Sequence, residues 1–111
     1  MINIEKRDKI DIISFTVSNI NALITDEIRD GIMKVIDNSN SKVIIDLAGV
    51  NYIDSSGFGC FLSLMKAARS NYGTLKFARP EPKVMEIFKT LHLHTVFQIY
   101  DDIDTCIASF K

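Results

Sequence analysis

The alternation of apolar and polar residues divides the chain into short strands and amphipathic helices. Ile2–Lys6 alternates as a half-exposed strand does, and Ile10–Val17 has the apolar content of a second strand. Only a short polar turn separates these two segments, so they predict an antiparallel hairpin. The β-branched run Val43–Ile45 is typical of a strand covered on both faces. Two further strands are expected at Thr74–Ala78 and Val96–Tyr100.

Four helices are predicted where apolar residues recur at helical spacing. The first covers Thr25–Asp37, and its buried stripe is Ile28, Ile32, Val35 and Ile36. The second covers Ser55–Ser70, Pro80 and Pro82 bracket the start of the third, and Asp101-Asp102 cap the last. Their predicted inward stripes are Phe58, Phe61, Leu62, Met65 and Ala68; Val84, Ile87, Phe88 and Leu91; and Ile103, Cys106, Ile107 and Phe110.

The predicted element order is β-β-α-β-α-β-α-β-α, without a linker or repeat. Strands that alternate with helices imply right-handed crossovers and a parallel sheet, which the first hairpin makes mixed. We therefore expect a single α/β sandwich domain over residues 1–111, with a mostly parallel five-stranded sheet and about four helices.

The segment that joins the third strand to the second helix carries the chain's most distinctive chemistry. Asp54 or Ser55 is a natural N-cap for this helix, because either side chain can accept from its first backbone N–H groups. Gly57 and Gly59 remove bulk from the first turn, so an external group is expected to approach the backbone closely. The Ser55 hydroxyl would stand at the positive end of the helix dipole. This position favours a phosphate, either bound or covalently attached.

The run from Asp46-Leu47 through Ile53-Asp54-Ser55-Ser56-Gly57-Phe58-Gly59 resembles the signature of STAS domains. It is most similar to that of stand-alone anti-sigma factor antagonists. The resemblance implies a STAS α/β sandwich that binds a serine-kinase anti-sigma factor and thereby releases a sigma factor. It also implies that Ser55 is the phosphorylated residue (Ser56 being the less favoured acceptor), that Ser56 helps to cap the helix, and that Asp46 is structural. The partner-binding residues that it implies are Asn21, Asp54, Ser56, Gly57, Phe58 and Gly59.

The loop before the first helix departs from the family pattern. Ile20-Asn21 stands where the family usually has Leu-Asp, the preceding glycine is absent, and the loop is one residue longer. Asn21 can form hydrogen bonds but carries no charge. If the family aspartate helps the kinase, phosphorylation of this chain is expected to be slow, altered or lost. Phe58 in place of the usual leucine keeps a large apolar side chain.

Composition excludes several classes of function. Hydrophobic residues at 47% with 24% charged residues are typical of a globular domain. The formal net charge of −1 provides no general attraction to nucleic acid or anionic lipid. We see no signal peptide, and no apolar run approaches the roughly 20 residues of a membrane-spanning helix. Two cysteines are too few for a disulfide scaffold, so we expect a reduced, cytoplasmic protein.

Other candidate sites have weaker support in the sequence. His92 and His94 have no cysteine or carboxylate at metal-ligand spacing, and no Rossmann fingerprint or P-loop lysine is present, so neither a metal nor a cofactor is expected. No nucleophile–base pair is evident, so an enzyme is not expected. The resemblance also implies an alternative function, a stand-alone STAS scaffold or a small-ligand module that binds an anion or nucleotide in a stress-sensing or lipid-transport assembly. Cys60, Leu64 and Ala67 lie off the inward stripe and form either an exposed apolar patch or a surface covered by a neighbouring helix. Cys60 is accordingly either a partly exposed, oxidisable thiol or a small apolar residue.

Overall fold

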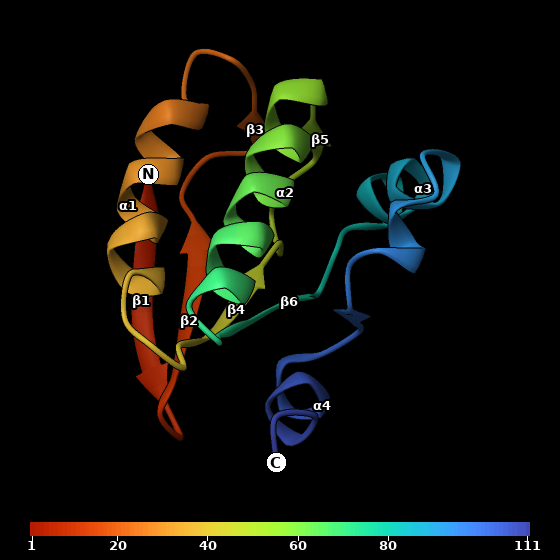
Figure 1. The fold of residues 1–111 in the computed structure, drawn as a ribbon. Coiled ribbons are helices and arrows are strands. Elements are labelled where there is room, and N and C mark those ends of the chain that lie inside the picture. Colours follow the sequence, from red (N-terminus) through yellow and green to blue (C-terminus); the bar gives the residue numbers. More distant parts are fainter.

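The computed structural model describes residues 1–111 and arranges them around a five-stranded sheet (Figure 1). The strand order is β1-β2-β4-β6-β7, and only β1 runs antiparallel to its neighbour. The bounds are β1 (Ile2–Arg7), β2 (Ile10–Phe15), β4 (Lys42–Asp46), β6 (Thr74–Ala78) and β7 (Ile99–Tyr100). The predicted α/β fold is confirmed, with a mixed, mostly parallel five-stranded sheet and an antiparallel first hairpin.

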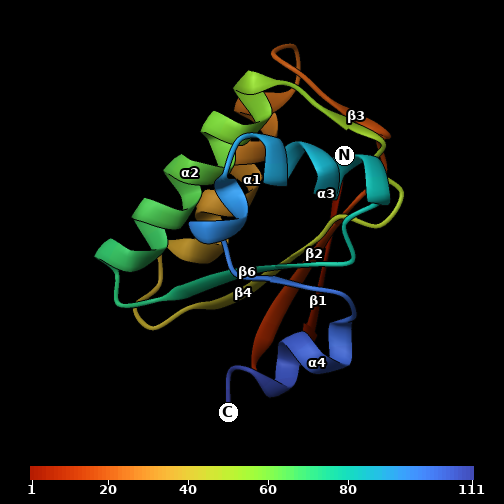
Figure 2. The ribbon, with the colours of Figure 1, turned by 90° about the vertical axis from the view of Figure 1, so that its right-hand side faces the viewer.

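All four predicted helices are present. They are α1 (Thr25–Ile36), α2 (Ser55–Ser70), α3 (Pro82–Thr90) and α4 (Ile103–Ala108). Figure 2 shows α1, α2 and α3 on one side of the sheet and α4 alone on the other. None of these helices has the length and apolar content needed to cross a membrane.

The larger part of the core lies between the sheet and the α1–α2 pair. Ile28, Ile32 and Ile36 of α1 are buried as predicted. Cys60 and Leu64 are also buried, and the Cys60 thiol lies 3.8 Å from the Thr25 carbonyl oxygen at the start of α1. The off-stripe residues of α2 are therefore covered by a neighbouring helix and do not form an exposed patch. Ala67 is half-buried against the same core.

The fifth strand is shorter than predicted. Only Ile99 and Tyr100 pair with β6, and a short 3₁₀ helix, η1 (Leu93–Thr95), precedes them. Phe97 turns inward to pack against Phe77, with ring centroids 4.7 Å apart. The chain therefore reaches the sheet only after Phe97. The prediction of a strand over 96–100 was wrong at its start, where Val96 is exposed.

Some positions of the predicted stripes are less buried than expected. Leu91 is exposed, because α3 ends at Thr90 and His92 then adopts a left-handed conformation with φ 57°. Leu91 therefore lies outside the helix, and its side chain does not continue the buried face that contains Phe88. Five other stripe residues are only half-buried: Val35, Leu62, Ile87, Ile103 and Phe110.

Two very short strands were not predicted. β3 (Asn19–Ile20) and β5 (Tyr52–Ile53) form a separate parallel pair, with Ile20 aligned with Ile53. Two residues are too few to show an alternating pattern in the sequence. This pair matters for function because β3 leads to the α1 loop and β5 leads directly to α2.

A buried lysine holds α4 against the opposite face of the sheet. Lys76 of β6 is only 7% exposed, and its ammonium donates to the Ser109 hydroxyl (2.8 Å) and to the Ser109 carbonyl (3.1 Å). The same Nζ lies 4.6 Å from the ring centroid of Phe110 and 5.5 Å from that of Tyr100. Cation–π contacts and charged hydrogen bonds therefore complement the apolar packing of this short helix.

We predict that Lys76→Met loosens α4. Methionine keeps the length of the stem but removes the donors, which should lower the free energy of unfolding by about 1–2 kcal/mol. Urea denaturation measures the loss, and amide exchange should accelerate in α4 more than in α1. Lys66→Met on exposed α2 surface is the control. Unchanged exchange in α4 would show that packing alone holds it.

Candidate functional site

Two loops meet at one end of the molecule, where α1 and α2 both begin (Figures 1 and 2). The pairing of β3 with β5 aligns Asn19 with Tyr52 and Ile20 with Ile53. The Asp54 N–H then donates to the Ile20 carbonyl at 3.1 Å. The Asn21 loop and the Asp54–Gly59 turn therefore lie side by side, as a common binding surface requires.

Asp54 joins these two loops through its carboxylate. One oxygen, Oδ1, accepts from the Gly57 N–H at 3.0 Å, which makes Asp54 the N-cap of α2. The other oxygen, Oδ2, accepts from the Ala22 N–H at 3.3 Å in the loop before α1. The sequence predicted either Asp54 or Ser55 as the N-cap of α2, and in the structure the N-cap is Asp54. Ser56 makes no side-chain hydrogen bond, so the capping role that the resemblance implied for Ser56 is not found.

Ser55 is the first residue of α2 and is exposed. Its hydroxyl makes no hydrogen bond within the protein, because Asp54 already provides the cap. Ser56 is half-buried. The Ser55 hydroxyl is therefore accessible to a group that approaches this end of the helix.

Gly57 is required for packing inside the protein. A Cβ at this position would lie 2.5 Å from Cγ2 of Ile53 and 3.1 Å from Cγ2 of Ile20. The expectation that Gly57 admits an external group was therefore wrong: the close approach is between α2 and the β3–β5 pair. Gly59 is different, because it is exposed and a Cβ there would meet nothing within 4 Å.

Phe58 belongs to the core. Its ring is buried and packs edge-on against Phe88 of α3, with centroids 5.1 Å apart. Asn21 is half-buried, and its Oδ1 accepts from the Leu23 N–H at 3.0 Å. Of the six predicted partner-binding residues, Gly59 is exposed, Asn21, Asp54 and Ser56 are half-buried, and Gly57 and Phe58 are buried within the protein.

Asp46 forms a structural ion pair at the end of β4. Its carboxylate is buried and accepts from the Arg79 guanidinium, with 3.0 Å between Oδ1 and Nε, and also from the Ala48 N–H at 3.1 Å. This hydrogen bond with Asp46 raises the pKa of Arg79 above its ordinary value. The pair ties the ends of β4 and β6 together beneath the loop that leads to Asp54.

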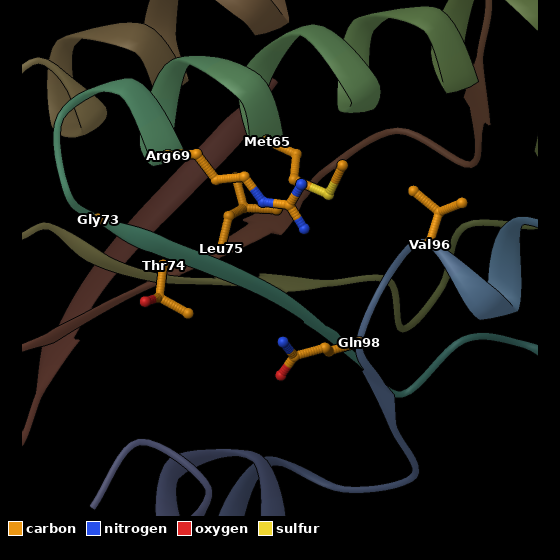
Figure 3. A pocket seen from close by; sticks show the side chains of 7 residues that line it. All are labelled: Met65, Arg69, Gly73, Thr74, Leu75, Val96 and Gln98. Atoms are coloured by element: carbon orange, nitrogen blue, oxygen red, sulfur yellow. The ribbon is translucent and has the colours of Figure 1, made fainter.

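The two surface hollows lie away from Ser55. One, of about 150 Å³, opens along the edge of β6 beneath Arg69 and beside Gln98 (Figure 3). The other is a flat depression on α1 around Met33. No group of three or more histidine, cysteine or acidic residues is arranged to hold a metal ion. The surface around Ser55 is therefore open, which suits contact with another protein better than enclosure of a small ligand.

The fold and the site define a class: an α/β domain that presents an unbonded serine hydroxyl at a capped helix N-terminus. A family model described as the STAS domain matches residues 1–106. The chain belongs to the STAS domain family.

Its relatives include anti-sigma factor antagonists. Over 106 residues the chain is 26% identical to a Bordetella bronchiseptica protein that carries the name anti-sigma factor antagonist BtrV, covering 94% of this chain and 91% of that protein. An anti-sigma factor antagonist domain from Planctomyces limnophilus has a TM-score of 0.89, with 19% identity and coverage of 97% and 96%. Unphosphorylated SpoIIAA has a TM-score of 0.79, with 18% identity and coverage of 99% and 96%. The phosphorylated form of Bacillus SpoIIAA has a TM-score of 0.71, with 17% identity and full coverage of both chains.

Two features of this surface were not predicted from the sequence. The Ala22 N–H is a partner of Asp54, and no side-chain pattern signals a backbone donor. Leu23 is almost fully exposed, although a leucine just before a helix is ordinarily expected to pack. Asn21 is the nearest sequence signal, because an asparagine side chain that bonds the backbone two residues onward marks a turn.

We predict opposite effects of the same substitution at the two glycines of α2. Gly57→Ala should lower the free energy of unfolding by about 1–3 kcal/mol, because its Cβ clashes with branched core side chains. Gly59→Ala should raise it by about 0.5–1 kcal/mol, because the position is open and alanine favours helix. Urea denaturation of the two variants is the measurement. A stable Gly57→Ala would contradict internal close packing.

We also predict that both cysteines are unreactive in the folded protein. Burial raises the pKa of Cys106 to about 11 and raises the pKa of Cys60. A thiol reagent at pH 8 should therefore label neither cysteine in the native protein and both cysteines in urea. Rapid native labelling would contradict the burial of these residues.

The raised pKa of Cys106 also makes stability depend on pH. An unfolded thiol loses its proton near pH ~8.5, whereas Cys106 in the folded protein has a pKa of about 11. The free energy of unfolding should therefore fall as the pH rises from about 8.5 to about 11.

Proposed function

We propose that this chain is an anti-sigma factor antagonist. It binds a serine-kinase anti-sigma factor in the cytoplasm, frees a sigma factor, and is released when the kinase phosphorylates Ser55. The observation that carries the proposal is the Ser55 hydroxyl, which is exposed and unbonded at the N-terminus of α2. The names of the relatives give independent support, since several are anti-sigma factor antagonists.

Phosphorylation at this position would change the surface without unfolding the domain. The modification adds about −1.5 to −2 charge and a bulky, strongly solvated group. The N-terminal end of a helix favours this charge, and the N-cap of α2 is Asp54, so no capping bond is lost. The phosphate would, however, stand beside the Asp54 carboxylate and would lose its solvation in any packed interface. The free-energy cost of this charge repulsion and lost solvation is sufficient to dissociate a complex.

The proposed contact surface consists of the exposed residues around Ser55. Gly59 lies one turn further along α2, and its open surface allows a partner to approach the helix closely. The Asn21 loop and Asp54 form the neighbouring edge. Gly57, Phe58 and the half-buried Ser56 support this surface from within or at its border.

Asn21 sets the expected rate of the proposed modification. It occupies the position of the usual family aspartate, and its Oδ1 is engaged by the Leu23 N–H. No carboxylate of this loop is therefore available to orient the serine or the kinase. We expect phosphorylation to be slow, and Asn21→Asp to accelerate it.

The test uses each serine-kinase anti-sigma factor of the source organism, purified with magnesium and nucleotide. Isothermal titration calorimetry should show that the wild-type chain binds one of them. Ser55→Asp should weaken this binding by about a hundredfold or more. Ser55→Ala should keep the affinity but abolish incorporation of phosphate from ATP. Thermal unfolding should be nearly unchanged in both variants.

Ser56→Ala is the matched control and should retain both binding and phosphorylation. Full affinity of Ser55→Asp would contradict the switch. If no serine-kinase anti-sigma factor binds the wild-type chain, the proposed function itself is wrong.

A further inference from the structure

Leu23 is the most exposed large apolar side chain of the protein, at 93% of its maximum. It lies in the loop between β3 and α1. An isolated exposed leucine is ordinary on a protein surface. What distinguishes Leu23 is the way its backbone is held and the site that it adjoins.

The loop that carries Leu23 is held by hydrogen bonds on both sides of this residue. The Leu23 N–H donates to Oδ1 of Asn21 at 3.0 Å. The following Ile24 and Thr25 N–H groups donate to the Asn21 carbonyl at 3.1 and 3.2 Å. The preceding Ala22 N–H donates to Asp54 at 3.3 Å. The backbone at Leu23 is therefore held in a defined position, and little backbone entropy remains to be lost when the side chain is bound.

Asp54 connects Leu23 directly to the proposed phosphorylation site. This carboxylate bonds the residue before Leu23 and also caps the helix that begins at Ser55. A protein that covers Ser55 would thus meet Leu23 at the same edge. Figure 1 shows the loop and the first turn of α2 at the same end of the molecule.

The surface next to Leu23 is acidic. Asp26, Glu27 and Asp30 of α1 are all exposed. Arg29 forms an ion pair with Asp26, which leaves a net negative charge on this turn. An apolar side chain beside exposed acids is complementary to an apolar pocket bordered by lysine or arginine.

We propose that Leu23 is an apolar anchor by which this chain binds its anti-sigma factor. The occupant of this surface is the serine-kinase anti-sigma factor, through an apolar pocket with a cationic border. The inference rests on the proposed function and adds a binding residue to it. Ser55 then controls when the complex exists, and Leu23 contributes to the affinity of the complex.

The test compares Leu23→Ala with wild type in calorimetric titration against the same purified anti-sigma factor. Because the Leu23 side chain would be buried in the complex, its truncation to alanine should raise the Kd by about 10- to 50-fold. Leu23→Met should restore most of the affinity because it keeps the apolar volume. Neither substitution should alter thermal unfolding, since Leu23 contributes almost nothing to the folded core.

Tyr72→Ala is the matched control. Tyr72 is 84% exposed and follows the last turn of α2, so its truncation should leave the Kd unchanged. The 16 residues of α2 span about 24 Å, so Ser55 and Tyr72 lie at opposite ends of this helix. Methyl NMR should also show that the Leu23 resonances broaden or shift when the anti-sigma factor is added.

Three outcomes would overturn the inference. If wild type binds the anti-sigma factor and Leu23→Ala binds equally well, the anchor is wrong while the proposed function stands. If no anti-sigma factor binds wild type, both fail. If sedimentation shows that the free chain self-associates and Leu23→Ala abolishes this, Leu23 is a contact between copies of the chain.

Discussion

The geometry of the site depends on a single carboxylate. Asp54 has two oxygens, and each accepts from the backbone of a different loop: Gly57 at the start of α2 and Ala22 before α1. One side chain thus fixes the beginning of α2 and the position of the neighbouring loop together. A hydroxyl at this position could form the cap but has too short a reach to bridge both loops. The aspartate is therefore a connector between two surfaces as well as a cap.

This connection is possible only because the underlying strands approach closely. The β3–β5 pair brings Ile20 against Ile53, and Gly57 allows α2 to pack directly on these side chains. Beneath them, the Asp46–Arg79 pair joins the ends of β4 and β6. Ile20, Ile53, Gly57 and Asp46 are all buried, so the exposed residues around Ser55 are supported from inside the protein. Such support holds a binding surface in place at little entropic cost during association.

The parts predictable from sequence were those with a repeating pattern. The helices of residues 25–37 and 55–70 and the buried strand after Val43 have clear periodicity, and the fold followed from their order. The fifth strand failed at Val96, because the need to bury Phe97 outweighed the local preference for a strand. The capping role of Asp54 was among the predicted alternatives. Its second bond, to Ala22, was not predictable, because the donor is a backbone group 32 residues away. The internal role of Gly57 likewise depends on Ile53 and Ile20, whose contact only the fold creates.

Asp54 caps α2 and Ser55 does not, so a modification of Ser55 changes the surface without removing a bond that holds the helix. If the serine were the N-cap, phosphorylation would remove the bond that starts α2, and binding and folding would change together. Because Asp54 forms the cap, the Ser55 hydroxyl makes no hydrogen bond that stabilises the fold. The helix N-terminus favours the added charge, while a packed interface does not. Under the proposed function, a phosphate would therefore be tolerated by the domain and rejected by its partner. This asymmetry is what a reversible switch requires.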